Sequence, residues 1–518
     1  MTNKVFEIEG SLSIEDCYRL MHSDNCKVIL SQSSSKSVTE SRQKIEQVIN
    51  SKKTVYGVNT GFGSLANVRV NDRELRDLQL NLIRSHCVGV GPFFSDEIVR
   101  GVLLLRANTL AIGYSGVREI VIETLLNCLN SRIYPRIPEI GSLGASGDLA
   151  PLAHMSLALL GEGEVNYQGN IISAAEALRL AGINPVELHA KEGLALINGT
   201  PVMCALAVEI LVRLQNLLKV ADISATLSLE ALTGTDKAFQ PELHKLRPHK
   251  GQQMSARNVY EMLKGSLNRS SHIGCDRVQD AYSLRCVPQV HGACYDAFFH
   301  AWDTIRIEIN SVTDNPIVLE QEIVSGGNFH GEPVSMVLSY LNMAICELGS
   351  ISERRQNRLV NHNLSHLPPF LVAESGLNSG MMIAHYTSAA CVSENKCLAY
   401  PPVVDSLSTS ADQEDHVSMG VTSARHCMRT LDNLESVLSI EMMIACQAME
   451  FIEETPSPVL KKVLDCVREV VEPLEKDRNL SPDIASIRRL IADGIIVKIV
   501  EEEIGDLMQW PSGTRDIV

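Results

Sequence analysis

The sequence predicts a mainly α-helical fold, in which a long central helical bundle follows a smaller, loop-rich N-terminal region. Aromatic residues make up only 4% of the chain. Leu, Ala, Ser and Met are abundant, and this composition suits long, closely packed helices. From about Asp72 onward, apolar residues recur mostly with helical spacing, and runs that alternate like strands become rare.

The N-terminal region begins with short elements. Val5-Phe6-Glu7-Ile8-Glu9 alternates as a strand does, and Ser13-Ile14-Glu15-Asp16 resembles a capped helix start. The serine-rich stretch from Ser33 to Ser37 favours a loop, and we expect a helix from about Thr39 to Asn50.

The end of that helix leads Tyr56 into a loop that contains Gly57, Gly61 and Gly63. Glycines permit a mobile lid or the close approach of a substrate, so this loop is a candidate part of a site. Its simpler interpretation is a connection between two elements.

A buried helix is predicted from Asp148 to Gly161. The segment has an acidic N-cap, Pro151 in the first turn, an apolar run and a terminal glycine. The preceding run Gly144-Ala145-Ser146-Gly147 therefore lies at a helix N-terminus, where the helix dipole favours developing negative charge.

The later part of the chain contains segments long enough to cross a large bundle. Composition shifts near residue 205, which divides an N-terminal region, 1–205, from a helical-bundle region, 206–518, although no flexible linker separates them. The long segments are Pro201 to Leu232, Ala293 to Ile309, Pro333 to Val360, Ser379 to Leu398 and Thr422 to Phe451.

Charge and cysteine content narrow the class of protein. A net charge of -16 and a pI near 5.4 argue against nucleic acid or an anionic membrane as the main partner. No uninterrupted apolar run reaches the length of a membrane span, since Arg106 and Glu123 break the runs beside them. The fourteen cysteines include no CxxC pair, and no secretory leader is recognisable. We therefore expect reduced, mostly buried thiols in a cytoplasmic enzyme.

Ala145-Ser146-Gly147 can be converted by the protein itself into an electrophile. If the Gly147 amide nitrogen attacks the Ala145 carbonyl and two waters are lost, the tripeptide becomes a 5-methylidene-imidazol-4-one ring (MIO). Glycine offers an unhindered nitrogen, alanine adds little bulk, and serine loses its hydroxyl to leave the methylene. An ordinary turn at a helix start is the alternative, and the tripeptide alone permits both.

The longer string from Gly141 to His154 closely resembles the signature of the aromatic amino-acid ammonia-lyases. The resemblance covers most of the chain in the family's order, and it implies the family's helical superfold. It also implies a homotetramer with active sites shared between subunits, an MIO group formed autocatalytically, no external cofactor and no metal. The further matching motifs are Tyr56 to Gly63, Asn198-Gly199-Thr200, Tyr282-Ser283-Leu284-Arg285, Thr313-Asp314-Asn315-Pro316, Gly326-Gly327-Asn328-Phe329-His330 and Gln413 to Met419.

The resemblance implies a role for each of several polar residues. Tyr56 is the candidate base that takes the β-hydrogen, for which its pKa must fall well below the ordinary value of about 10. Arg285 is assigned to the substrate carboxylate, which a guanidinium holds by two parallel hydrogen bonds. Tyr282 shares a face with Arg285 if the segment is helical. For each residue alone, packing or a solvated surface position is the ordinary interpretation.

The remaining contacts follow from the same resemblance. Asn198 is expected, with Tyr282, to hydrogen-bond around the MIO or the leaving amine, while Gln279 and Asn315 are weaker polar contacts. Phe329, in its glycine-flanked loop, is expected to close over the ring.

Two residues indicate the substrate. His86 in Ser85-His86 resembles the family's histidine-directed branch, and so does Glu414, where phenyl-directed members usually carry an amide. A carboxylate accepts a hydrogen bond from an imidazole, whereas burying it beside a bare phenyl ring is unfavourable. The implied substrate is L-histidine and the products are trans-urocanate and ammonia. A core histidine and a solvated carboxylate are the alternative interpretations.

Other chemistries fit less well. A serine hydrolase needs a glycine two residues after the nucleophile, where Asp148 stands, and a preceding strand, where the chain has Pro135 and Pro138. His362 and His366 have a spacing seen in metal sites but lack the glutamate of that motif. An aminomutase, or a lyase of the same family that acts on another aromatic amino acid, stays open, because lid dynamics decide between release and return of the amine.

Overall fold

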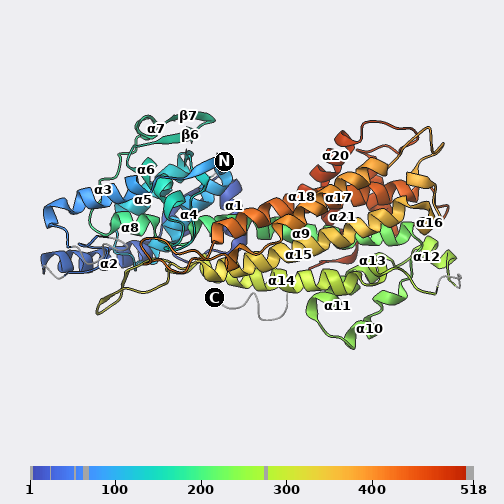
Figure 1. The fold of residues 1–518 in the computed structure, drawn as a ribbon, viewed down its shortest axis with the longest axis horizontal. Coiled ribbons are helices and arrows are strands. Elements are labelled where there is room, and N and C mark those ends of the chain that lie inside the picture. The colour runs from blue at the N-terminus through green and yellow to red at the C-terminus, as the bar shows by residue number, and fades with distance from the viewer. Residues whose placement is uncertain (1–3, 24, 52–53, 62–68, 274–277, 509–518) are drawn as a thin grey trace. The chain divides into compact units, whose positions relative to one another are not determined.

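The computed structural model describes residues 4–23, 25–51, 54–61, 69–273 and 278–508. Its elements are mostly helices, with short strands between some of them, so the predicted mainly helical fold is confirmed (Figure 1). The chain divides into two compact units. Unit 1 consists of Met1–Val212, Trp302–Ser339 and Pro401–Arg425, and unit 2 consists of Arg213–Ala301, Tyr340–Tyr400 and His426–Val518.

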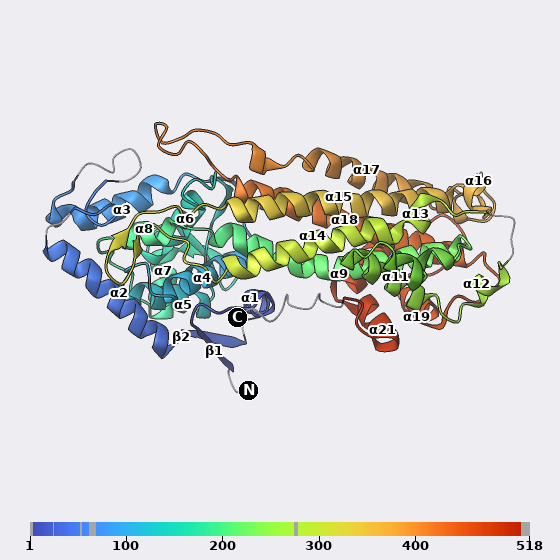
Figure 2. The same cartoon turned by 90° about the horizontal axis from the view of Figure 1, so that it is seen from below.

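Unit 1 starts with the strand and the capped helix that the sequence predicts, together with a second strand that it does not predict. Strand β1 (Lys4–Ile8) pairs in parallel with β2 (Cys26–Leu30), and the two lie side by side in Figure 2. Helix α1 (Ile14–His22) connects them. Its N-cap Ser13 accepts a hydrogen bond from the Asp16 amide at 3.0 Å, which confirms the predicted cap.

Helix α2 (Gln32–Asn50) begins seven residues before the predicted start, so the loop expected at Ser33 to Ser37 is wrong. The Ser31 side chain accepts a hydrogen bond from the Ser34 amide at 3.1 Å and caps the helix. Ser34, Val38 and Ser41 are then buried on one face. Packing of these small residues outweighs the weak preference of serine for loops.

The rest of unit 1 combines short strands with helices. The strands form a two-stranded sheet, β3 with β5, a three-stranded sheet in the order β4-β6-β7, and the pair β8 with β9, all antiparallel. The helices are α3 (Leu75–His86), α4 (Asp96–Ala111), α5 (Glu119–Asn130), α6 (Leu149–Leu159), α7 (Ala174–Ala181) and α8 (Glu192–Ile197). The strands are β3 (Val90–Phe93), β4 (Ile133–Pro135), β5 (Pro138–Ile140), β6 (Glu164–Tyr167), β7 (Asn170–Ser173), β8 (Ile317–Val318) and β9 (Ile323–Val324).

The sequence predicted no strand before the Ala145-Ser146-Gly147 loop, and this prediction was wrong, because the short strand β5 ends at Ile140. The prolines Pro135 and Pro138 lie at the ends of the short strands β4 and β5, where the missing N–H costs no ladder hydrogen bond. Asp148 still stands where a nucleophile elbow requires glycine, and this residue makes the loop unlike that motif.

The long helices agree closely with the predicted segments. They are α9 (Pro201–Ala231), α14 (Val287–Glu308), α15 (Glu332–Val360), α17 (Met382–Leu398) and α18 (Gly420–Met449). Helix α14 starts six residues earlier than predicted, because Pro288 occupies the first turn, where a proline is tolerated.

Unit 2 adds shorter helices to this set and is held by buried polar contacts. The shorter helices are α10 (Pro241–Lys245), α11 (Lys250–Met262), α12 (Leu267–Ser271), α13 (Tyr282–Arg285), α16 (His362–Ser365), α19 (Pro458–Arg468), α20 (Ser481–Ala492) and α21 (Ile495–Ile504).

Glu441 of α18 connects the unit 2 parts of three long helices, α9, α15 and α18, which lie side by side in Figures 1 and 2. Its carboxylate accepts hydrogen bonds from Arg355 of α15 at 2.9 Å, Ser352 of α15 at 2.6 Å and Ser228 of α9 at 2.8 Å. The Arg355 and Glu441 side chains are fully buried. Buried charges are tolerated only with such complete pairing, so these contacts specify how the helices pack.

Two of the long helices meet the length and composition of a membrane span, which corrects the expectation that none does. These are α9 and α15, with mean hydropathies of 1.5 and 1.4. However, 72% and 67% of the respective apolar windows are buried inside the structure. Burial of this extent is typical of the core helix of a soluble protein.

Candidate active site

A cavity of about 550 Å³ in unit 1 brings together seven of the predicted site residues. They come from segments far apart in the sequence, and Tyr56 is the one described residue of its glycine-containing loop that lines the cavity. A neighbouring cavity of about 500 Å³ shares Tyr56 and Ser325 with it, but contains no other predicted residue. The seven are Tyr56, His86, Ser146, Asn198, Asn315, Phe329 and Glu414.

The Ala145-Ser146-Gly147 loop requires glycine at its third position. Gly147 has a φ of +80°, and a Cβ atom there would overlap the carbonyl of Gly199. Gly199 also forms two backbone hydrogen bonds with the loop. Its carbonyl accepts from the Asp148 amide at 2.7 Å, and its amide donates to the Ser146 carbonyl at 3.3 Å. The motif around Asn198 therefore holds the tripeptide directly.

A second segment supports the loop from behind. Met419 donates its amide to the Leu143 carbonyl at 2.8 Å, and Ser418 donates its hydroxyl to the Gly144 carbonyl at 3.3 Å. Ala145 is only 7% exposed and packs with Val417 and Met419. The backbone of the tripeptide is thus buried while the Ser146 side chain reaches the cavity.

Asp148 does not cap the helix that it precedes, contrary to the sequence prediction. Its side chain makes no cap hydrogen bond to α6. It accepts instead from the Val202 and Met203 amides at the start of α9, at 2.8 and 3.1 Å, and from the Ser142 hydroxyl at 3.3 Å. Complete burial raises the pKa of Asp148 to about 7, although these donors act in the opposite direction.

Glu414 reaches Ser146 across the cavity. The Ser146 hydroxyl donates to Glu414 Oε1 at 3.3 Å, over a sequence separation of 268 residues. The Glu414 backbone forms two hydrogen bonds with Thr409, at 2.9 and 3.2 Å, which fix the loop that carries the carboxylate. A half-buried carboxylate therefore stands at the residue whose hydroxyl the proposed cyclisation would remove.

His86, the last residue of α3, presents a neutral imidazole to the same cavity. Its Nδ1 lies 2.8 Å from the Leu82 carbonyl, and since a carbonyl only accepts, Nδ1 carries the proton and Nε2 is the acceptor. Desolvation lowers the pKa of His86, partly offset by the Leu82 carbonyl and the charge of Glu414.

Asn198 and Asn315 lie in contact. Of their two side-chain oxygens, only that of Asn198 accepts no hydrogen bond from the described residues. The Asn198 amide group donates to the Asn315 carbonyl at 3.0 Å, while Asn198 Oδ1 is buried and has no hydrogen-bond partner within the described residues. Asn315 Oδ1 instead accepts from Ser325 at 3.1 Å and from the Gly326 amide at 2.8 Å. Asn315 thus holds the loop that leads to Phe329.

Gln279, Tyr282 and Arg285 belong to unit 2 and do not line this cavity. They form a cluster of their own at α13. Arg285 donates to Gln279 Oε1 at 2.9 Å, and its guanidinium lies 4.7 Å from the centre of the Tyr282 ring, as their predicted common helical face requires. Tyr282 is 72% exposed.

Tyr56 is half-buried and lines both cavities. The adjacent Gly57 has a φ of +71°, and a Cβ atom there would crowd Leu194 and Pro316, so the loop is closely packed at this point. Gly63, the last glycine of the predicted loop, lies outside the described residues.

Sequence reasoning missed the apolar walls and several polar residues of the cavity. Leucine and isoleucine in helices carry no signal that separates a site from a core. Gln413 and Gly326 lie within two of the motifs that resemble the family, and this placement could have indicated that they belong to the site. The missed residues are Leu82, Leu149, Leu194, Ile197, Ser325, Gly326, Ser410 and Gln413.

The chain is similar to known proteins over almost its whole length. The model of the aromatic amino acid lyase family matches residues 12–469. The chain is 46% identical to a histidine ammonia-lyase of Alkaliphilus metalliredigens (strain QYMF), over 97% of this chain and 100% of that protein.

Two solved structures have the same fold. The crystal structure of histidine ammonia-lyase from Trypanosoma cruzi superimposes with a TM-score of 0.90 at 40% identity, over 99% of this chain and 96% of the other. A tyrosine aminomutase from Streptomyces globisporus also gives 0.90, at 37% identity, over 96% of this chain and 99% of the other.

Proposed function

Because the chain belongs to the aromatic amino acid lyase family, we propose that it converts L-histidine to trans-urocanate and ammonia without oxidation, the first step of histidine degradation. The identity of 46% to a histidine ammonia-lyase over almost the whole chain supports this substrate. The observation that carries the proposal is the placement of Glu414 beside Ser146, in a cavity that also holds a neutral His86.

The residues at Ala145-Ser146-Gly147 fit an MIO group formed by the chain itself. Gly147 occupies a position that excludes any side chain, Ala145 is small and buried, and Ser146 has the hydroxyl to be lost. When formed, the group supplies an electrophile for the substrate amino group. No external cofactor is part of the proposal.

Glu414 and His86 select an imidazole substrate. The Glu414 carboxylate accepts a hydrogen bond from an imidazole N–H or exchanges a proton with it, and His86 Nε2 is an acceptor at the same cavity. A phenyl ring offers no such hydrogen bond and would remove water from the carboxylate, which is unfavourable.

Tyr56 and Asn198 interact with the two groups that leave the substrate during elimination, the β-proton and the amine. Tyr56 takes the β-proton on its phenolic oxygen, from the wall of the cavity. Asn198 Oδ1, buried and without a partner in the described part of the chain, accepts a hydrogen bond from the leaving amine. Phe329 covers the reacting group and excludes water.

Arg285, with Gln279 and Tyr282, binds the substrate carboxylate from another copy of the chain in a homotetramer. An exposed tyrosine and a guanidinium already oriented by Gln279 suit a surface that completes a neighbour's cavity. The protein is proposed to act in the cytoplasm on this small molecule, with no nucleic acid or membrane partner.

The test compares L-histidine, L-tyrosine and L-phenylalanine as substrates of the purified enzyme, with the ultraviolet absorbance of each product as the readout. Histidine is expected to be turned over most efficiently. Ser146→Ala should abolish nearly all activity while the oligomer stays folded. Wild-type turnover by that variant would contradict the proposed electrophile.

An aminomutase is the second candidate, since a tyrosine aminomutase shares the fold at the same TM-score. It is less favoured because that likeness has 37% identity, against 46% for the histidine ammonia-lyase. Formation of β-histidine from L-histidine, with neither urocanate nor ammonia released, would favour the aminomutase.

A further inference from the structure

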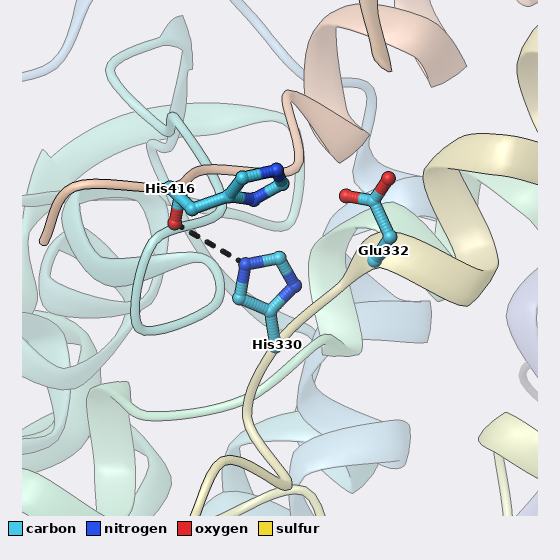
Figure 3. A group of neighbouring side chains, drawn as sticks. All are labelled: His330, Glu332 and His416. Carbon is cyan, nitrogen blue, oxygen red and sulfur yellow. Dashed lines mark hydrogen bonds between the residues drawn. The ribbon is translucent and has the colours of Figure 1, made fainter. Parts of the chain in front are cut away.

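Three metal-ligating side chains of unit 1 converge beside the cavity without having a role in the proposed reaction. His330, Glu332 and His416 each offer a ligand atom, and these atoms all lie within 4.8 Å of one another. No other group of three His, Cys, Asp or Glu side chains within the described ranges does so. Figure 3 shows the His330 and His416 rings and the Glu332 carboxylate gathered around one space.

One carboxylate oxygen of Glu332 has no hydrogen-bond partner among the described residues. Its Oε2 atom is buried and accepts no hydrogen bond from the described residues, and no lysine or arginine among them forms an ion pair with this side chain. Leaving a buried carboxylate oxygen without a partner is unfavourable. A cation in the space that Glu332 shares with the two imidazoles would remove this cost.

His330 is already oriented as a ligand. Its Nε2 lies 3.3 Å from the His416 carbonyl, so Nε2 carries a proton and donates it, and Nδ1 keeps a lone pair. Histidine ligands of metals usually donate their other ring N–H to a carbonyl or carboxylate in this way. The hydrogen bond therefore selects the tautomer that binds a cation.

We infer that His330, Glu332 and His416 bind a Zn²⁺ ion. Two imidazoles and one carboxylate suit Zn²⁺, whereas Mg²⁺ and Ca²⁺ prefer oxygen ligands alone. Zn²⁺ takes such ligands at about 2.0–2.2 Å in a tetrahedral arrangement, which places the ligand atoms roughly 3.4 Å apart. Ligand atoms that lie up to 4.8 Å apart must therefore approach one another by as much as about 1.4 Å. His416 is exposed and has room to rotate.

The ion has a positioning role. His330 follows Phe329 directly, and His416 lies two residues after Glu414, and both of these neighbours line the cavity. A shared ion ties the two segments together, so it holds Phe329 and Glu414 at fixed separations. The inference does not rest on the proposed function: if the protein bound no ion, the proposed reaction would still stand.

The experiment uses the full-length protein after dialysis against a chelator. Zn²⁺ is then titrated by isothermal calorimetry, and Co²⁺, which replaces Zn²⁺ in such sites, is followed by its visible absorption. Wild type is expected to bind one ion per chain. Glu332→Gln and His416→Ala should each weaken binding by at least about tenfold, since even outer partners of a metal site contribute 10–100-fold.

His249→Ala is the control, because His249 is an exposed histidine of unit 2 outside the cluster, and this variant should bind as wild type does. Circular dichroism verifies that each variant is folded. Zn²⁺ binding by wild type that His416→Ala and Glu332→Gln leave unchanged would overturn the inference. So would the absence of Zn²⁺ binding by folded wild type.

Discussion

At the scale of single residues, the carboxylate of Glu414 interacts with two other residues of the cavity, Ser146 and His86. It accepts from Ser146 at 3.3 Å and favours the charged form of His86, against the larger effect of desolvation. One carboxylate therefore influences both Ser146, the residue of the proposed electrophile, and the imidazole of His86. This position was predicted from its motif, but the contact with Ser146 was not.

Replacing Glu414 by glutamine should lower kcat/KM for histidine by about 10²–10⁴-fold, the usual contribution of a group that exchanges a proton during a reaction. Glutamine keeps the shape of the side chain but loses the charge and the basicity. Steady-state kinetics measure the effect. Asp415→Asn removes an exposed carboxylate next to it and should leave the rate near wild type. Equal rates for Glu414→Gln and wild type would refute the assigned role.

Gly147→Ala should prevent formation of the MIO group, because a methyl group at this position overlaps the Gly199 carbonyl. Intact-mass spectrometry reports cyclisation as the loss of two waters, and activity should disappear with it. Gly169→Ala is a matched control. Gly169 has a similar φ of +81°, but a Cβ atom there meets nothing within 4 Å. A Gly147→Ala protein that still loses two waters would contradict the steric argument.

At the scale of elements, Asp148 connects the start of α6 with the start of α9. The local sequence predicted a cap for α6, and the residue type was right for a cap. The packing of the two helix starts decided which amides donate to Asp148, and these are the Val202 and Met203 amides at the start of α9. The same kind of tertiary packing extended α2 through the serines at its start.

Asp148→Ala should destabilise the protein by about 2–4 kcal/mol, since two amides of α9 lose their acceptor in a buried setting. Chemical denaturation measures the loss, and Asp148→Asn, which retains one acceptor oxygen, should lose less. An unchanged midpoint for Asp148→Ala would show that water replaces the carboxylate.

The pH dependence of this contribution has a definite sign. The folded-state pKa of Asp148 is raised to about 7 from 3.8, so the folded protein holds this proton more tightly than the unfolded chain does. Stability from this group is therefore complete at low pH and is lost as pH rises through about 7. The free energy of unfolding of wild type, relative to Asp148→Asn, should fall between pH 4 and pH 8. A rise over that range would contradict the pKa shift.

At the scale of the whole molecule, the proposed chemistry is divided between the two units. The cavity residues belong to unit 1, while Gln279, Tyr282 and Arg285 belong to unit 2. An enzyme that needs both sets can obtain the second from another copy, as the proposed homotetramer does. Symmetric assembly then forms several equivalent sites.

Mixing two inactive variants tests this arrangement. Ser146→Ala lacks the electrophile and Arg285→Ala lacks the carboxylate clamp, so each alone should be nearly inactive. Coexpressed in equal amounts, they should recover up to about a quarter of wild-type activity, because random assembly pairs intact halves in that share of sites. If each chain completes its own site, no mixture regains activity. The separately expressed variants, mixed without subunit exchange, are the control.

The sequence by itself determined the features that depend on neighbouring or periodic residues. The predicted Ser13 cap and the long helices follow from local geometry and helical spacing, and the structure contains both nearly as predicted. Only the tertiary structure decided which distant residues meet. Ser146 reaches Glu414 across 268 positions, and His330 and Glu332 meet His416, because long-range packing depends on the complementary shapes of whole elements. No local pattern encodes those shapes.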